Sequence, residues 1–519
     1  MAVSPGATID ISAAMAVAPV PLGAWLAVAP VALCITLGAI LLMARSSLRL
    51  QAWIALCGLG LLVLIDAALL AKVIAEGPVT MVMGRWYPPF GIAFTVDLLG
   101  ALMALASAIV ALATGIYGLA DIDETARRYG FYPLLMMLMA GVSGAFLTGD
   151  VFNLYVWFEV LLISSFGLLV LGSERGQIDG AMKYAVLNLI GTTLFLIAVG
   201  ILYGVFGTLN MADISIKAET LREGAPMMTL ASLFLLAFAM KAAAFPVNFW
   251  LPASYHTPRI VVSALFAGLL TKVGIYALLR VMFLLLPVER EQLSLLIAIV
   301  GAVTIIVSAL GVLAQDDIRR LLGYVVISGI GNMLVGAALG TAGGLSGAIF
   351  YALQSMVLMT ALYFVAGQAA TLGKSFSMTA LGGLYRRNGV FAAISLVLFL
   401  SACGLPPFAG FWPKVMLVKA SLDVGAWWLA APILIGSLLT TIAFGRLFLL
   451  AYWRPAAAVP ETRKSLDLRV LLPLLGLSAL VVGFGLLPER LLALVQGASM
   501  ELSDPTIYLR SVFPGSAAP

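Results

Sequence analysis

The chain has 519 residues, of which 62% are hydrophobic and only 10% are charged, and its formal net charge is +5. Because about a quarter of the residues in a soluble domain are charged, this composition predicts a protein that crosses a membrane many times. The three cysteines are far apart and the chain has one histidine, so neither a metal site nor a cofactor is expected.

Apolar runs of about twenty residues, the length of a membrane-crossing helix, follow one another almost to the end of the chain. Strands of a β-barrel would instead be about ten residues of alternating polarity. We therefore expect an all-α polytopic protein with about fourteen transmembrane helices. The expected spans lie near 22–43, 52–74, 95–120, 130–148, 150–171, 182–206, 227–250, 258–286, 292–314, 318–340, 344–370, 391–421, 427–453 and 468–488.

Basic residues gather in alternate loops, for example at Arg127, Arg128, Arg319 and Arg320. Loops rich in lysine and arginine face the cytoplasm, so both termini are expected on the non-cytoplasmic side. The polar stretches around 207–226, 371–390 and 454–467 are expected to be connectors.

Two proline-containing stretches interrupt the seventh and twelfth spans. "FPVNFWLP" at 245–252 resembles "LPPFAGFWPK" at 405–414, and the two lie five spans apart. Matching broken segments indicate a transporter built from two repeated bundles, and an odd number of spans between them makes the second bundle inverted. Proline cannot donate a hydrogen bond to the preceding turn, so the breaks predict hydrated cavities beside Lys241 and Lys414.

Ionisable residues at membrane depth are functional candidates, because burying them in hydrocarbon is costly. Those far from any loop are Asp66, Glu159, Lys241, Lys272 and Lys414. A static ion pair between Glu159 and Lys241 is the structural alternative, and it leaves the other two lysines unexplained. The basic residues closer to span ends are expected to extend toward water, namely Lys72, Arg280, Lys419 and Arg446.

Polar side chains at helical spacing form stripes on three spans. They comprise Tyr184, Asn188 and Thr192 on the sixth, Tyr324, Ser328 and Asn332 on the tenth, and Tyr351, Gln354 and Ser355 on the eleventh. Such stripes either hold helices together or line a proton path, and both interpretations stay open. The eleventh span has no titratable Asp, Glu, His or Lys. Either hydroxyls and water bridge Lys272 to Lys414 by way of Tyr324, Ser328, Gln354 and Thr360, or the path between the two lysines is not continuous.

Several stretches resemble a known family of proton-translocating membrane subunits. They are "VWFEVLLISSF", "MKAAAFPVNFWLPASYHTP", "LLTKVGIYALLR", "GLPPFAGFWPK", "FTVDLLGALM" and "DDIRRLLGYVVIS". The family comprises large subunits of Mrp-type multisubunit sodium/proton antiporters and membrane-arm subunits of complex I and related hydrogenases. The resemblance implies two inverted five-helix repeats, formed by spans four to eight and nine to thirteen.

The resemblance also implies roles for individual residues. Glu159 and Lys241 would form the coupling pair, Lys272 the central relay and Lys414 the exit-side lysine. His256 would transfer protons or sense the neighbouring subunit. Lysine at position 414 and the short C-terminal tail are most similar to the D-type subunits of Mrp antiporters.

The expected function is therefore that of a proton-translocating subunit in a sodium/proton antiporter of a prokaryotic cell membrane. It would be a secondary transporter rather than an enzyme, working with other membrane subunits and without nucleic acid. The alternative is a proton-pumping subunit of complex I or a membrane-bound hydrogenase. Asp66 is the best candidate for a residue linked to the cation.

The whole chain, 1–519, is expected to be one membrane domain. Its expected parts are the N-terminal helices 22–120, the repeats 130–286 and 292–453, and the last helix with its tail, 454–519.

Overall fold

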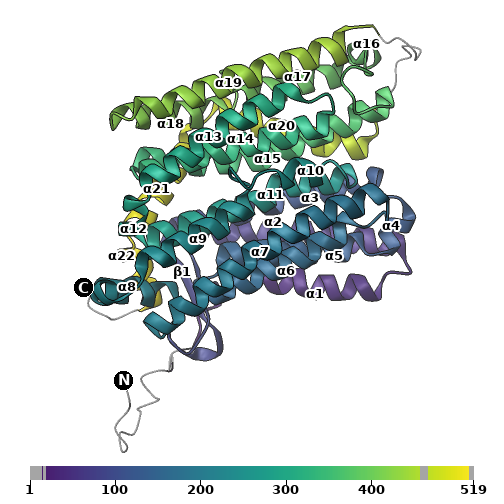
Figure 1. The fold of residues 1–519 in the computed structure, drawn as a ribbon. Coiled ribbons are helices and arrows are strands. Elements are labelled where there is room, and N and C mark those ends of the chain that lie inside the picture. The colour runs from purple at the N-terminus through teal and green to yellow at the C-terminus, as the bar shows by residue number, and fades with distance from the viewer. Residues whose placement is uncertain (1–14, 16–18, 456–465, 514–519) are drawn as a thin grey trace, which may run out of the picture.

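The computed structural model describes Met15, residues 19–455 and residues 466–513, and Figure 1 shows that it is built almost entirely of helices. Its elements in chain order are η2 (Leu22–Ala27), α1 (Ala29–Met43), α2 (Leu48–Glu76), β1 (Val79–Val82), η3 (Met83–Arg85), β2 (Ala93–Val96), α3 (Leu98–Asp121), α4 (Glu124–Arg128), α5 (Phe131–Leu147), α6 (Val151–Leu169), α7 (Arg175–Phe206), α8 (Met211–Leu221), η4 (Arg222–Gly224), α9 (Met227–Ala242), α10 (Trp250–Ser254), α11 (Ile260–Arg280), η5 (Val281–Leu285), α12 (Pro287–Gln292), α13 (Ser294–Ala314), α14 (Ile318–Leu339), α15 (Ala342–Gly373), α16 (Leu384–Arg387), α17 (Gly389–Cys403), α18 (Phe411–Asp423), α19 (Trp427–Phe448), η6 (Leu449–Trp453), α20 (Leu468–Leu486), α21 (Glu489–Ser503) and α22 (Thr506–Val512).

The prediction of a helical protein that crosses the membrane many times is confirmed. Within the described residues, 10 helices are long and apolar enough to span a bilayer. Four shorter apolar helices accompany them, and these are α1, α5, α9 and α17.

Two expectations need correction. The fold is not purely α-helical, because β1 and β2 pair antiparallel with Val79 opposite Val96. Both strands contain the β-branched residues that favour extended backbone. In addition, 207–226 is more than a connector, since Asn210 accepts hydrogen bonds from the backbone of Ala212 and Asp213 and thereby caps α8.

Both broken spans are present. α9 ends at Ala242, and Ala243 has a left-handed backbone with φ 63° before α10 begins. α17 ends at Cys403, and Gly404 has φ 80° before α18 begins. In each case a proline, Pro246 or Pro407, follows the left-handed residue three positions later, which supports the likeness between the two sequence stretches.

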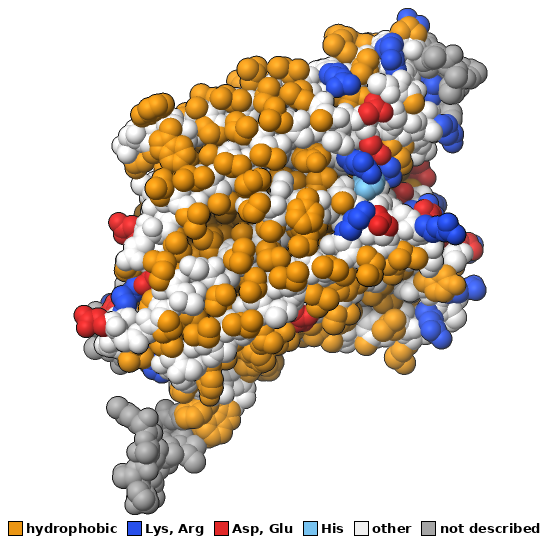
Figure 2. Space-filling view, viewed as in Figure 1, with side chains coloured by type: hydrophobic (Ala, Val, Ile, Leu, Met, Phe, Trp, Pro, Cys, Tyr) orange, Lys and Arg blue, Asp and Glu red, His pale blue; other side chains and the backbone are white. Residues whose placement is uncertain are grey.

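The helices form two blocks in the view of Figure 1: α1 to α11 in the lower block and α13 to α20 in the upper one. Long α15 packs on α11 from the lower block and on α14 and α18 from the upper. Figure 2 shows hydrophobic side chains over the flank, whereas lysines and arginines gather at the right-hand end around α4 and α16. We call this the basic-rich end; the β-hairpin, α8 and α22 lie at the other end.

Candidate functional site

Lys241 lies in the last turn of α9, directly before the helix break, and its side chain is only 6% exposed. Close helix contacts hold this turn in place. A Cβ at Gly274 of α11 would lie 3.0 Å from the backbone nitrogen of Ala242, and the indole of Trp250 donates to the carbonyl of Met240 over 3.1 Å. The backbone nitrogen of Phe245 donates to Thr304 Oγ1 of α13, so the broken backbone is satisfied by a side chain.

Glu159 is the ninth residue of the 19-residue α6 and is half-buried. It lies near enough to Lys241 to interact with it electrostatically, yet no ion pair joins the two among the described residues. Lys241 Nζ has no hydrogen-bond partner there and instead lies 5.6 Å from the centre of the Phe158 ring. The Glu159–Lys241 pair is therefore open in this structure.

Lys272 lies in the second half of α11 and is fully buried. Its ammonium donates to the carbonyl of Ala267 over 2.5 Å, so the side chain runs back toward the N-terminus of its own helix. No carboxylate lies within ion-pair distance in the part of the chain that the structure describes. The positive form of Lys272 is thus balanced by a backbone dipole alone.

Lys414 lies in the first turn of α18 and is half-buried. Its ammonium donates to the carbonyls of Ala402 (3.3 Å) and Cys403 (2.9 Å), the last two residues of α17. Pro406 and Pro407 cannot donate to these two carbonyls, so the lysine takes the place of the missing helical bonds. Glycine is favoured at 404, because its φ is 80° and a Cβ would lie 2.6 Å from Lys414 Cδ.

A cavity lies beside Lys414, whereas its predicted hydration stays a prediction. It has a volume of ≈ 350 Å³, lies between α18 and α19, and is lined mostly by apolar side chains together with Lys414, Lys419 and Asp423. The cavity at the other break, ≈ 160 Å³, is lined by Phe245, Pro246 and Val247 and by apolar residues of α9 and α13. Its walls do not include Lys241.

His256 lies in the loop between α10 and α11 at the basic-rich end, where Figure 2 shows the pale blue histidine side chain among blue basic side chains. Its Nδ1 donates to the carbonyl of Pro252 (2.8 Å), and Nε2 accepts from Arg320 of α14 (3.1 Å). Burial, and next the nearby Arg320 charge, lower the pKa of His256. The neutral imidazole therefore connects the loop before α11 to the start of α14.

The polar stripe on α7 lies beside Lys241. A Cβ at Gly191 would be 3.7 Å from Lys241 Cε, and the Tyr184 hydroxyl is 2.9 Å from Ser165 of α6. Asn188 and Thr192 donate to carbonyls one turn earlier in α7. These local bonds also suit a purely structural role.

The stripes on α14 and α15 are buried except for half-buried Tyr324. Asn332 bonds to the carbonyl of Ser328, whereas Gln354 Oε1 has no partner among the described residues. Ser355 is 4% exposed. Thr360 donates to Met356 of its own helix and also approaches the Ala264 carbonyl of α11 over 3.3 Å.

Asp66 is fully buried on α2, and neither of its carboxyl oxygens has a hydrogen-bond partner within the described chain. Because α2 packs on α1, α3 and α5, this residue is separate from the lysine-bearing helices. Lys72 and Lys419 form i,i+4 ion pairs near helix ends, and Arg446 bonds a carbonyl at the surface, as expected for residues extending toward water.

The prediction for Arg280 was wrong. It is 1% exposed and forms two 2.6 Å hydrogen bonds to Asp97, itself 2% exposed. Tyr276 and the ring of Tyr508 from α22 complete the cluster. Position near a span end suggested an extended side chain, but α21 and α22 cover this end. Asp97, near the start of the third expected span, was the available signal for a buried partner.

Comparisons with known proteins identify the family of this chain. The sequence profile described as "NADH:quinone oxidoreductase/Mrp antiporter, TM" matches residues 148–440. The chain is 34% identical to the D-type Na(+)/H(+) antiporter protein of Alkalihalophilus pseudofirmus, over 94% of this chain and 99% of that one. It is 36% identical to the D-type Na(+)/H(+) antiporter protein of Bacillus subtilis, over 86% and 91% respectively.

Solved structures show the same fold. A chain of the Mrp complex from Dietzia sp. DQ12-45-1b has a TM-score of 0.88 at 28% identity, covering 95% of this chain and all of that one. A chain of respiratory complex I from Thermus thermophilus has a TM-score of 0.79 at 24% identity, covering 92% and 99%, which is a likeness of fold alone. The chain therefore belongs to the NADH:quinone oxidoreductase/Mrp antiporter family of membrane proteins.

Proposed function

We propose that this chain is the D-type, proton-carrying subunit of a multisubunit sodium/proton antiporter. The identity to D-type antiporter proteins along nearly their whole length supports this assignment. The observation that carries the proton-carrying role is the state of the three lysines. Lys241 Nζ has no partner in the described residues, and Lys272 and Lys414 donate only to backbone carbonyls.

A lysine in such surroundings can bind and release a proton without breaking an ion pair. Burial disfavours its charged form, whereas an approaching carboxylate favours it. In the proposed mechanism, closing the Glu159–Lys241 pair holds the proton on Lys241. Opening the pair releases it toward Lys272 and then Lys414, with Tyr184, Asn188 and Thr192 lining the first half of the path. Tyr324, Ser328, Gln354 and Ser355 line the second.

The proposed topology follows from the helix lengths and the charge distribution. The ten long and four shorter apolar helices would make fourteen crossings. The sections 130–286 and 292–453 would be inverted repeats, flanked by 22–120 and 454–519. We place the basic-rich end in the cytoplasm of a prokaryotic cell and both termini outside, following the positive-inside rule.

Sodium is proposed to cross mainly through companion membrane subunits. It prefers several oxygen ligands, and lysines repel it. The candidate on this chain is Asp66. The alternative, a role in complex I, is supported by the likeness of fold. No feature of the site favours that role over sodium/proton exchange.

The test uses the assembled complex in everted vesicles, with dye quenching as the measure of sodium-dependent proton movement. Separate Glu159→Ala, Lys241→Ala and Lys272→Ala variants should abolish exchange at normal assembly. The matched control is Lys183→Ala, because Lys183 forms an exposed pair with Asp179 at the start of α7. Near-normal exchange in any of the three test variants would remove that residue from the path.

A further inference from the structure

Three polar contacts follow one another along the first half of α11. The backbone nitrogen of Val261 donates to Asp121 Oδ2 (2.9 Å), Thr360 Oγ1 lies 3.3 Å from the Ala264 carbonyl, and Lys272 Nζ bonds the Ala267 carbonyl (2.5 Å). At 1.5 Å per residue, the first and last of these lie about 9 Å apart along the helix axis. The Lys272 side chain thus runs along α11 toward the end of the helix at which Asp121 lies.

Close packing places two hydroxyls along the same stretch. A Cβ at Gly367 of α15 would lie 2.5 Å from the Tyr117 hydroxyl of α3, and one at Gly268 of α11 would lie 2.4 Å from Thr360 Oγ1. α3, α11 and α15 therefore meet along this segment. A hydroxyl can donate and accept at once, as a proton relay requires.

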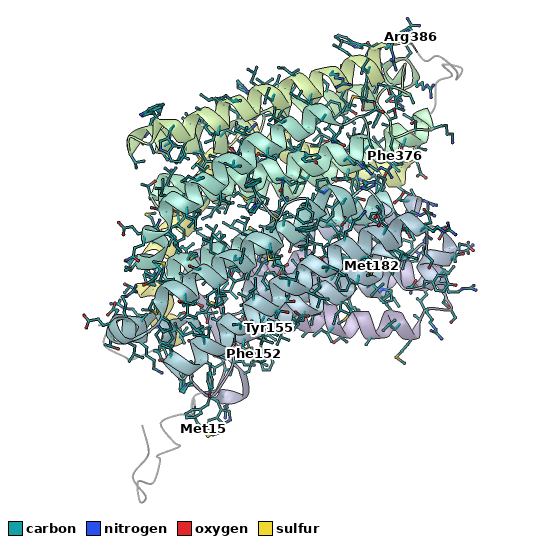
Figure 3. All side chains as sticks on the ribbon, in the orientation of Figure 1. Met15, Phe152, Tyr155, Met182, Phe376 and Arg386 are labelled. Atoms are coloured by element: carbon teal, nitrogen blue, oxygen red, sulfur yellow. The ribbon has the colours of Figure 1, made fainter. Side chains whose placement is uncertain are left out.

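Asp121 is half-buried and lines two cavities. The first, ≈ 290 Å³, lies between α3 and α15, where Gln368 and Thr371 also line it. The second, ≈ 210 Å³, lies against the start of α7 and the loop before α11. Phe376, one of its wall residues, is labelled near this end of the molecule in Figure 3. Each cavity is far larger than one water molecule needs.

We propose that Asp121 is the cytoplasmic proton-uptake group that supplies Lys272. The Asp121 carboxylate takes a proton from cavity water and becomes a carboxylic acid. It passes this proton through water and the Thr360 hydroxyl, which gives up one proton as it receives another, to the neutral amine of Lys272. Asp121 returns to a carboxylate, and Lys272 becomes an ammonium. The inference rests on the proposed function and moves Thr360 from the exit half of the path to the uptake half.

A structural role competes with this inference, because Asp121 also accepts from the first turn of α11 and so caps that helix. Asp121→Asn separates the two roles, since an amide oxygen still accepts from Val261 but the side chain cannot take up a proton. Thr360→Val removes the hydroxyl at nearly constant volume, and Thr360→Ser restores it.

The charged and titratable groups around Asp121 determine the pH readout. Tyr117 lies on the same helix, and those on neighbouring segments are Glu174, Arg259, Arg319, Lys374 and Asp467. They are unchanged in all the variants, so a difference in pH profile reports on position 121 itself. A group that collects protons matters most when protons are scarce, so the loss of rate should grow as cytoplasmic-side pH rises.

We expect Asp121→Asn to slow turnover of the assembled antiporter at least about tenfold, as loss of a proton-transfer group does, with unchanged apparent sodium affinity. Thr360→Val should slow it several-fold, and Thr360→Ser should recover the rate. The matched control is Asp123→Asn, because Asp123 lies two residues away, is exposed and caps α4.

A full rate in Asp121→Asn, or a loss that does not vary with pH, would overturn the inference. So would a Thr360→Val variant running at full speed, which tests the route even if the Asp121 variant assembles poorly. If Lys272→Ala is inactive while both of these variants are normal, only the uptake route fails. If Lys272→Ala itself is normal, Lys272 is not on the proton path, and the proposed relay from Lys241 through Lys272 to Lys414 fails as well.

Discussion

The buried Asp97–Arg280 pair allows a quantitative prediction of stability. Both side chains are almost completely removed from solvent, and the guanidinium makes two 2.6 Å bonds to the carboxylate. Asp97→Asn keeps the side-chain oxygen that accepts from Gly100 and caps α3, but it removes the negative charge and the oxygen that accepts from Arg280 Nη1. An isolated buried charge costs about 3–5 kcal/mol, which is the expected loss of unfolding free energy.

A double-mutant cycle completes the test. Its other two proteins carry Arg280→Gln alone and Arg280→Gln together with Asp97→Asn. The double variant contains no unpaired charge, so its loss should be smaller than the sum of the two single losses. Unfolding of purified protein in detergent, followed by tryptophan fluorescence, measures all four proteins. Asp179→Asn is the control, because its exposed pair with Lys183 contributes about 0–1 kcal/mol. Additive losses, or single variants as stable as the parent, would refute the reasoning.

Two further predictions concern Asp66 and His256. Asp66→Asn should weaken the apparent sodium affinity of the assembled antiporter, because the buried Asp66 carboxylate has no hydrogen-bond partner among the described residues and could offer its oxygens to a cation. An unchanged affinity would end that assignment. For His256, the lowered pKa in the folded state means that the unfolded chain binds more protons. The contribution of His256 to the free energy of unfolding should therefore be complete above about pH 6.5 and decline as the pH falls. Unfolding measured at several pH values should show less acid loss in His256→Gln, and parallel profiles for both proteins would contradict this.

The sequence allowed the helical segments to be predicted because a membrane-crossing helix leaves a long apolar run. The two breaks were also visible, since proline removes a backbone donor wherever it occurs. The β-hairpin between α2 and α3 was missed because its strands are only four residues each and lie beside long apolar runs. Helix α8 was missed because its composition is polar throughout much of its length.

Side-chain partners were less predictable than segments. Arg280 was expected to reach water, because sequence distance from a span end says nothing about what later helices cover. Conversely, Pro406 and Pro407 indicated freed carbonyls on α17, and the structure places the Lys414 ammonium on them. The inference about Lys414 depends on local backbone chemistry. The position of Arg280 depends instead on contacts between residues nearly two hundred positions apart or more.

Each broken span has a lysine at the C-terminal end of its first half-helix, although one lysine precedes the break in the sequence and the other follows it. Lys241 belongs to the last turn of α9 itself, before the break. Lys414 follows the break, in α18, yet its ammonium binds the last two carbonyls of α17. In both places a positive charge meets the negative end of a helix dipole, which stabilises the ammonium form. That shared setting offsets part of the cost of burial.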